Sequence, residues 1–195
     1  SSMTLDKSGV WHNDTSYALV LNNPDENLYK SYLAILNSKI TWYFLQVTGT
    51  ELRGGYFRFK TKYLEPFPLP DLDVQNIKLL SALADAQLLA HAQLQKHVSK
   101  FLNCAKNNLG LTKISEKLES FYKLEFKDFI AELKKQKIKL SLRDQDEWEE
   151  YFNSYRQNCT RLLLEIEESN RKIDQLVYGL YGLTEEEIAV IERGY

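Results

Sequence analysis

The sequence is poor in the residue types that build metal centres and disulfide frameworks. Among 195 residues it has two cysteines, Cys104 and Cys159, and three histidines. No Cys-x-x-Cys or His-x-x-x-His spacing occurs, and the two cysteines lie far apart in a chain with no other thiols. We therefore expect neither a zinc site nor a disulfide framework, and the pattern favours reduced cysteines and a cytoplasmic location.

Long apolar runs and catalytic motifs are lacking as well. No stretch approaches the roughly 18 apolar residues of a membrane span, and no signal peptide is visible. There is no Gly-x-Ser-x-Gly sequence, and the Gly54-Gly55 pair is too short for a phosphate-binding loop. Metal hydrolysis and serine chemistry are thus without local support. Because Met3 is the only methionine, we expect a fragment of a longer protein.

The formal net charge of −2 hides a strong asymmetry along the chain. Residues 30–63 carry six cations and one acid, a net charge of +5. Residues 71–140 carry twelve cations and eight acids, whereas residues 141–195 carry six cations and thirteen acids. A polyanionic partner is therefore expected to meet the N-terminal third and to avoid the C-terminal part.

The N-terminal third shows both strand and helix patterns. The apolar run 16–21 has strand character, and an Asn-Asn-Pro-Asp turn signal follows it. A helix is predicted from Asp25 or Glu26 to Gly49, because apolar residues recur there at three- and four-residue steps. A strand is predicted over 56–60, and the prolines at positions 66, 68 and 70 mark the exit from a domain.

Beyond Pro70 the pattern is helical. Heptad-spaced apolar stripes over 77–105 and 148–180 are typical of two long helices packed side by side. Further elements are shorter amphipathic helices within 114–133, a basic connector over 134–139, and a last helix over 185–192 behind a capping box. The predicted fold class is α+β, predominantly α: a small mixed α/β head (1–70) followed by a helical body (71–195) of long antiparallel heptad-patterned helices.

The segment LRGGYFRFKTKYLEPFPLP, residues 52–70, combines a Gly-Gly pair with a basic strand. Strand alternation places four residues on one face: Tyr56, Arg58, Lys60 and Lys62. The cations could neutralise several phosphates, and the glycines leave room for DNA to approach. The same face equally fits an edge strand that cations protect from aggregation. Spacing alone does not choose between these two interpretations.

Catalytic alternatives find little support in the other charged residues. The acids within 165–168 and 185–187 are most simply the solvated faces and the first turn of helices. His91 lies on a helical stripe, where a packed histidine is a simpler interpretation than a ligand. A stand-alone nuclease would need a cluster of carboxylates and a lysine that the sequence does not assemble.

Three motifs follow one another along the chain: Tyr32-Leu-Ala-Ile-Leu-Asn-Ser-Lys39, Gly49-x-x-Leu-Arg-Gly-Gly-Tyr56 and Tyr63-Leu-Glu-Pro-Phe-Pro-Leu-Pro70. Together they resemble the TaqI-like C-terminal specificity domain of adenine-specific DNA methyltransferases and of fused type IIG restriction-modification enzymes. The first and third motifs are also similar to the target recognition domains of type I specificity subunits, where a recognition head leads into long paired helices. The ending, residues 173–188, is similar to the tail of many type IIG polypeptides.

The resemblance implies that this chain reads DNA sequence and is itself non-catalytic. It implies a target-recognition head (1–70), truncated at its N-terminus, on a helical spacer (71–195). The parent enzyme's S-adenosylmethionine and Mg sites would lie in upstream methyltransferase and endonuclease domains, with no cofactor in this fragment. The implied partners are double-stranded DNA and those upstream domains. The heptad stripes leave open a homodimer or, alternatively, a protein-interaction module without DNA contact.

The DNA-binding residues that follow from this interpretation are Arg53, Gly54, Gly55, Tyr56, Arg58, Lys60, Lys62 and Lys39. The cations would contact phosphates or base edges, and Tyr56 would pack against a sugar or a base. The two glycines would allow the backbone to approach DNA closely. Asn37 and Ser38 would instead hydrogen-bond within the head. No catalytic or metal-binding residue is assigned.

Overall fold

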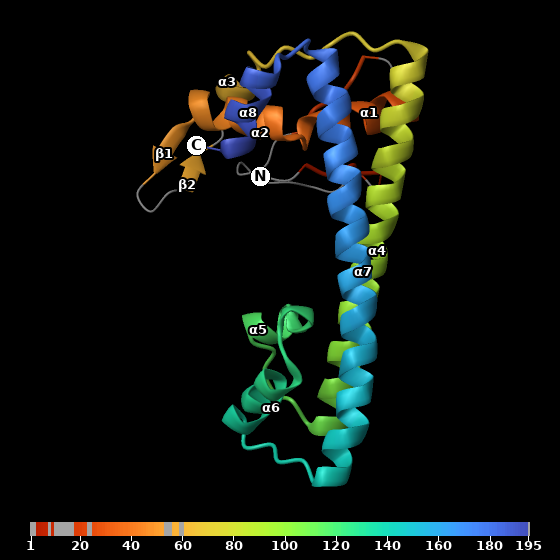
Figure 1. Ribbon diagram of the computed structural model, residues 1–195, viewed down its shortest axis with the longest axis vertical. Helices are drawn as coiled ribbons and strands as arrows, with labels where there is room; N and C mark the ends of the chain where they lie inside the picture. Colours follow the sequence, from red (N-terminus) through yellow and green to blue (C-terminus); the bar gives the residue numbers. More distant parts are fainter. Residues whose placement is uncertain are drawn as a thin grey trace. The chain divides into compact units, whose positions relative to one another are not determined.

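The computed structural model describes residues 3–7, 9, 18–22, 25–52, 56–58 and 61–194. It divides into two compact units, unit 1 (residues 1–86 and 168–195) and unit 2 (residues 87–167). The two long helices expected from the heptad stripes are present as α4 (Val74–Leu109) and α7 (Leu142–Leu180) (Figure 1). Because each long helix contributes a segment to both units, we describe the units one at a time.

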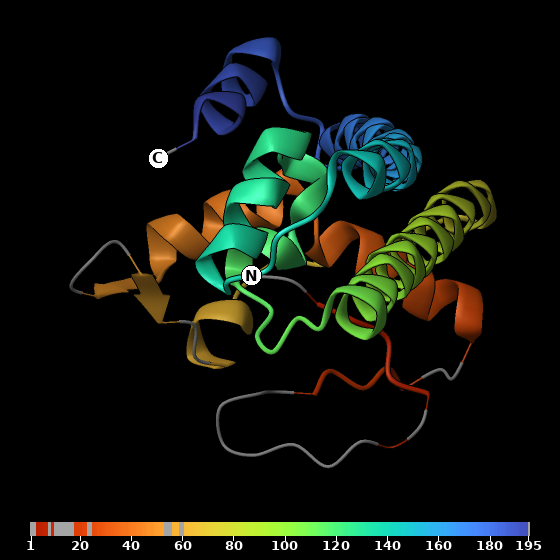
Figure 2. The same ribbon diagram turned by 90° about the horizontal axis from the view of Figure 1, so that it is seen from below.

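Unit 1 consists of short helices around one segment of each long helix. Its shorter elements are α1 (Glu26–Leu36), α2 (Lys39–Thr48), β1 (Thr50–Leu52), β2 (Tyr56–Arg58), α3 (Thr61–Leu64) and α8 (Glu185–Arg193). Residues 74–86 of α4 and 168–180 of α7 run side by side in opposite directions (Figure 1, Figure 2). The first 70 residues therefore share one compact unit with both ends of the helical body.

The predicted α+β fold class is wrong, because the described part of the chain is essentially all-α. Strand structure in that part is limited to β1 and β2, which pair with each other. Residues 18–21, which belong to the predicted strand over 16–21, form no strand, and Val20 is 77% exposed. A strand needs a neighbour to satisfy its N–H and C=O groups, and no described strand lies beside this run.

The single helix predicted from Asp25 onward is two helices, α1 and α2, separated by Asn37 and Ser38. Ser38 has an extended backbone, and its hydroxyl donates to the Ile35 carbonyl at 2.6 Å. The Asn37 side chain accepts from the Met3 N–H at 2.8 Å and donates to the Met3 carbonyl at 2.9 Å. Both side chains therefore bond within unit 1, as predicted. Periodicity missed the break because apolar spacing continues across it, whereas short polar side chains bond to backbone and end the helix.

The core of unit 1 joins helices from both ends of the chain. Ile35 of α1, Leu80 of α4 and Val177 of α7 are each fully buried in it. The other buried members of this cluster are Ala34, Leu36, Phe67, Ala84 and Ile173. Burial of such side chains is the main source of stability here, since each contributes about 1.5–3 kcal/mol relative to exposure.

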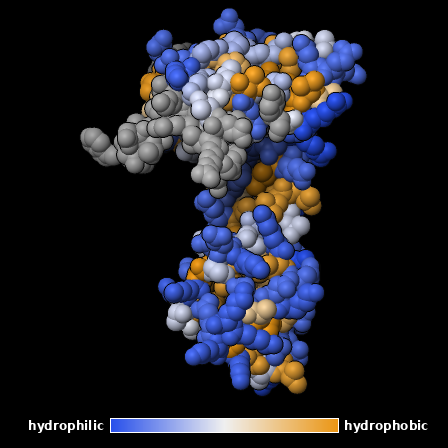
Figure 3. Space-filling model, turned by 90° about the vertical axis from the view of Figure 1, so that its left-hand side faces the viewer, coloured by the Kyte–Doolittle hydropathy of each residue, from blue (hydrophilic) through white to orange (hydrophobic). Residues whose placement is uncertain are grey.

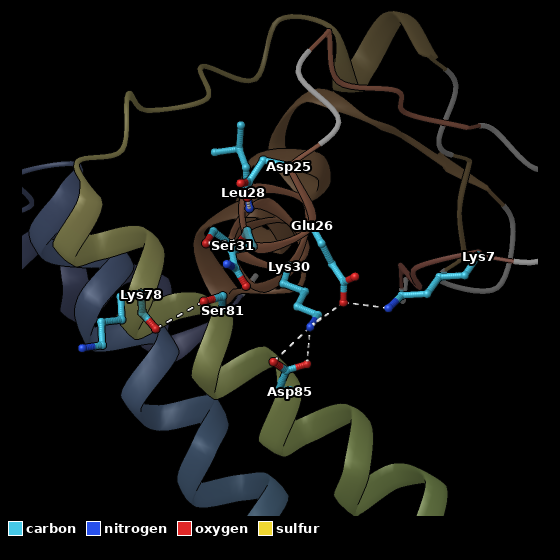
Figure 4. Close-up of polar contacts among 10 residues, drawn as sticks. Lys7, Asp25, Glu26, Leu28, Lys30, Ser31, Lys78, Ser81 and Asp85 are labelled. Carbon is cyan, nitrogen blue, oxygen red and sulfur yellow. Dashed lines mark hydrogen bonds and ion pairs between the residues drawn. The ribbon is translucent and has the colours of Figure 1, made fainter.

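A lysine also connects α1 to α4 within unit 1. The Lys30 ammonium lies 2.7 Å from Glu26 Oε1 and 2.8 Å from Asp85 Oδ1, and its side chain is only 12% exposed (Figure 4). The hydrogen bonds from Lys30 and Lys7 lower the pKa of the Glu26 carboxyl to about 2. Beside them, the Ser31 hydroxyl donates to the Ile77 carbonyl at 3.0 Å. Polar contacts thus fix the position of α1 on α4.

Unit 2 packs a small helical lobe against the remaining segments of α4 and α7. The lobe contains α5 (Glu116–Glu119), the 3₁₀ turn η1 (Phe121–Lys123) and α6 (Phe126–Lys135), in the region where shorter helices were predicted. The core of unit 2 is rich in aromatic side chains, of which Phe101, Phe121, Phe129 and Phe152 are fully buried. The outer face of this lobe is mostly hydrophilic (Figure 3).

Candidate functional site

The hairpin formed by β1 and β2 contains the centre of the predicted DNA-binding segment. The strands pair antiparallel, with Thr50 opposite Arg58 and Leu52 opposite Tyr56. Tyr56 and Arg58 are the first and last residues of β2. A two-stranded antiparallel ribbon is one of the elements that enter the major groove of DNA.

Six of the eight predicted DNA-binding residues fall within the sequence from Arg53 to Lys60. Arg53, Gly54, Gly55 and Lys60 lie outside the described residues. For Tyr56 and Arg58 the structure gives the path of the backbone in β2. The assignment of these residues to DNA binding stays a prediction.

Lys62 lies in α3 and not in a continuation of β2. It is exposed, and its ammonium lies 4.7 Å from the centroid of the Tyr63 ring. The Tyr63 hydroxyl is hydrogen-bonded to Thr50 Oγ1 at the start of β1, which ties α3 to the hairpin. Strand alternation therefore does not relate Lys62 to Tyr56, although the two residues belong to neighbouring elements.

Lys39, the remaining predicted contact, begins α2 and bonds to the C-terminal part of the chain. Its backbone N–H donates to Asp174 Oδ1 of α7 at 2.9 Å. Its ammonium forms an ion pair with Glu192 of α8, which also accepts from the Tyr178 hydroxyl at 3.0 Å. A phosphate contact by Lys39 would compete with this ion pair. No sequence pattern indicated that Lys39 would bond to Asp174 and Glu192, because Lys39 and Asp174 are 135 residues apart.

Asp174 takes the place of a local cap at the start of α2. The N-cap residue Ser38 makes no side-chain bond to that helix, since its hydroxyl is engaged with the preceding turn. Asp174 is 5% exposed, and burial raises the pKa of its carboxyl, although the Lys39 N–H and charge act in the opposite direction. The hydrogen bond from Lys39 instead lowers the pKa of Glu192. The N-terminus of α2 is thus capped by a helix from the far end of the chain.

Replacing Asp174 by alanine is expected to lower the free energy of unfolding by about 1–2 kcal/mol, because α2 loses its cap and the Lys39 N–H loses its acceptor. Asp174→Asn retains an acceptor oxygen and is expected to lose less. Since the native carboxyl has a raised pKa, the part of its stabilisation that depends on protonation is present at low pH and is lost as the pH rises through that pKa, whereas its bond from the Lys39 N–H remains. Asp174→Asn should therefore gain stability relative to the wild type between about pH 3 and about pH 7. Urea unfolding at both pH values measures this difference, and a constant difference would contradict the argument.

The proline-rich segment that follows α3 is fixed by aromatic side chains. Phe67 is 6% exposed and belongs to the core of unit 1. The Tyr181 hydroxyl donates to the Pro68 carbonyl at 2.6 Å, and the Tyr32 hydroxyl donates to the Pro70 carbonyl at 3.1 Å. The segment predicted as a domain exit is therefore held along the helices of unit 1 before α4 begins.

The described part of the chain offers neither a metal-binding cluster nor a membrane-spanning helix. Within it, no group of three or more His, Cys, Asp or Glu side chains is arranged to hold a metal ion. No helix there is both long and apolar enough to cross a membrane.

Comparison with known families gives two matches. Residues 1–69 match the TaqI-like C-terminal specificity domain, which confirms the predicted resemblance and indicates DNA recognition in restriction-modification. Neither a curated protein nor a solved structure matches the chain. Residues 73–177, more than half of the 195 residues, match the family described as Domain of unknown function (DUF8810), and the chain therefore belongs to that family.

Proposed function

We propose that this chain is the DNA sequence-recognition part of a type II restriction-modification enzyme. The observation that carries the proposal is the specificity-domain match over residues 1–69. The position of the antiparallel hairpin within that match supports it, because the hairpin and the residues beside it contain the basic segment. The parent enzyme would be an adenine-specific DNA methyltransferase, with or without a fused endonuclease, acting in the cytoplasm.

In this proposal the residues around the hairpin make the DNA contacts. Arg53, Arg58, Lys60 and Lys62 bind phosphates or base edges, and Arg suits guanine because it donates two parallel hydrogen bonds. Tyr56 packs against a sugar or a base. The glycines at positions 54 and 55 have no Cβ and let the backbone approach the duplex closely. Lys39 adds a phosphate contact when it exchanges its Glu192 partner for DNA.

The remaining parts of the chain position the head. The long helices after Pro70 would act as a spacer that holds the head at a fixed distance from the catalytic domains. The acidic residues of 141–195 would be turned away from DNA, because like charges repel. The S-adenosylmethionine and Mg sites would belong to upstream domains, which are the intramolecular partners of this chain.

The test is DNA binding by the intact chain and by the variant Arg53→Ala, Arg58→Ala, Lys60→Ala, Lys62→Ala. Fluorescence anisotropy with a labelled random-sequence duplex pool at several salt concentrations gives affinity and salt dependence. If each cation neutralises one phosphate, the slope of log K against log salt falls by about 3.6. At about 0.1 M salt the affinity is expected to fall at least about 100-fold.

A matched control removes the same charge elsewhere. The four exposed lysines of α4 at positions 78, 96, 100 and 106 are replaced by alanine, which is a strong helix former. This control should retain most of the affinity. If both variants lose the same amount of affinity, the affinity depends only on the net charge of the chain. That result would contradict the assigned contacts. If the intact parent protein binds no DNA, the alternative of a protein-interaction module is favoured.

A further inference from the structure

The end of α6 and the turn after it form a fixed platform in unit 2. The Ile138 N–H donates to the Leu133 carbonyl at 3.1 Å, and the Lys137 N–H donates to the Lys134 carbonyl at 3.0 Å. These two bonds define a Schellman motif, in which Lys137 occupies the position that glycine usually takes. The side chain of Gln136 then bonds to residues 112–113, accepting from both backbone N–H groups and donating to the Lys113 carbonyl.

Exposed lysines gather on this platform. Four of the six residues from 134 to 139 are lysines, and all four are exposed. Lys134 and Lys139 line one hollow of about 240 Å³ whose other walls are mostly apolar, so cations from α6 and from the connector border the same surface. The bonds of Gln136 to the backbone of residues 112–113 hold Lys113, which is also exposed, beside this turn. We call Lys113, Lys134, Lys137 and Lys139 the lysine surface.

The lysine surface has unpaired charge. Lys135 is paired with Glu132 at 2.6 Å, but no member of the lysine surface has an ion-pair partner among the residues that the structure describes. The nearest acid after the connector, Asp144, is engaged in capping α7 through Ser141. These ammonium groups are therefore available to an anionic ligand.

Lys137 also stands in a strained backbone conformation. Its φ of 63° lies in the left-handed region, which side chains with a Cβ disfavour. Glycine would fit this turn better. A lysine here therefore lowers the stability of the fold, but it adds a cation to the surface. Helix-dipole stabilisation explains cations in the last turn of α6, but it does not explain the lysines at positions 137 and 139, which lie beyond the helix.

We propose that the lysine surface of unit 2 binds the phosphate backbone of duplex DNA without sequence preference. This goes beyond the proposed function, which concerns the hairpin in unit 1. Lysine suits the role because it presents a point charge to phosphates without the planar geometry that arginine uses to read bases. Such contacts would add salt-dependent affinity through counterion release while leaving the choice of sequence to other residues.

The experiment compares the intact chain with the variant Lys134→Gln, Lys137→Gly, Lys139→Gln on a labelled duplex of random sequence. The expected result is a slope of log K against log salt that falls by about 2–3, and an affinity at least about tenfold lower at about 0.1 M salt. The single variant Lys137→Gly should bind more weakly and yet melt no lower than the wild type. Loss of folding would then not explain the loss of binding.

The matched control is Lys96→Gln, Lys100→Gln, Lys106→Gln, which removes the same charge from exposed positions of α4. An equal loss in this control, or no loss in the lysine-surface variant, overturns the proposal. So does competition by poly-L-glutamate that equals that of unlabelled duplex at the same charge concentration, because the surface would then fit an acidic protein segment.

The hairpin variant separates this inference from the proposed function. If the hairpin variant loses binding and the lysine-surface variant does not, the inference fails and the proposed function stands. If the lysine-surface variant loses binding and the hairpin variant does not, the inference stands and the proposed function fails. A chain that binds no duplex DNA even at about 0.05 M salt overturns both.

Discussion

Replacing Phe101 by alanine is expected to lower the free energy of unfolding of unit 2 by about 3–5 kcal/mol. Phe101 is fully buried at the centre of the aromatic cluster. Its ring stacks on Phe121 with centroids 3.8 Å apart and lies 5.6 Å from Phe129 and 5.9 Å from Phe152. Removing the ring leaves a cavity walled by rigid aromatic side chains, which cannot easily collapse into it. The cost should therefore lie in the upper part of the usual range.

Trp148 can report this loss, because its ring lies 6.4 Å from Phe101. In a background with Trp11→Phe and Trp42→Phe, tryptophan fluorescence during urea unfolding follows unit 2. Leu89→Ala is the control, since Leu89 lies on the same helix and is 61% exposed. It should change stability by no more than about 0.5 kcal/mol. A loss below about 1 kcal/mol for Phe101→Ala would show that the cluster repacks around the missing ring.

Replacing Phe67 by alanine is expected to lower the free energy of unfolding of unit 1 by about 3 kcal/mol. Phe67 is buried between two prolines, and its ring makes an edge contact with Phe44 at 5.2 Å and a tilted contact with Tyr181 at 5.9 Å. It is the one buried residue of segment 65–70 in the core of unit 1. Its loss should therefore both destabilise the unit and release that segment.

Two measurements check the Phe67 prediction. Urea unfolding followed by Trp42, with the other two tryptophans replaced by phenylalanine, gives the stability of unit 1. Limited proteolysis gives the accessibility of segment 65–70, which should increase. Leu69→Ala is a close control, because Leu69 lies two residues further along and is 38% exposed. If both variants are cleaved equally fast, the two tyrosine hydroxyl bonds hold the segment without Phe67.

Whether a prediction from the sequence was confirmed depends on how far apart in the sequence the interacting residues lie. The long helices α4 and α7 were predicted because their apolar residues recur every three or four positions. The capping box at Thr184 and Glu187 was predicted because its partners are three residues apart, and both of its bonds are present. The α+β assignment failed at residues 18–21, the described part of the predicted strand over 16–21, where an apolar run has strand composition but no described neighbouring strand.

In the candidate site, too, features that depend on nearby residues were predicted and features that depend on distant residues were not. The three motifs from Tyr32 to Pro70 indicated the specificity-domain family, and the match over residues 1–69 confirmed it. The pairing of Lys39 with Asp174 and Glu192 was not predicted, because no local pattern connects residues so far apart. Lys62 was placed on a strand face, whereas the structure has it in α3.

By itself the sequence determined the helical body, its helix signals, the charge asymmetry and the family of its N-terminal part, since these depend on neighbouring residues. The tertiary structure decided that α2 is capped by Asp174, that Lys39 pairs with Glu192, and that the ends of α4 and α7 share a core with α1. It also decided that the backbone of Lys113 lies beside the turn after α6. These features depend on contacts between distant segments, which form only when the chain folds and buries its apolar surface.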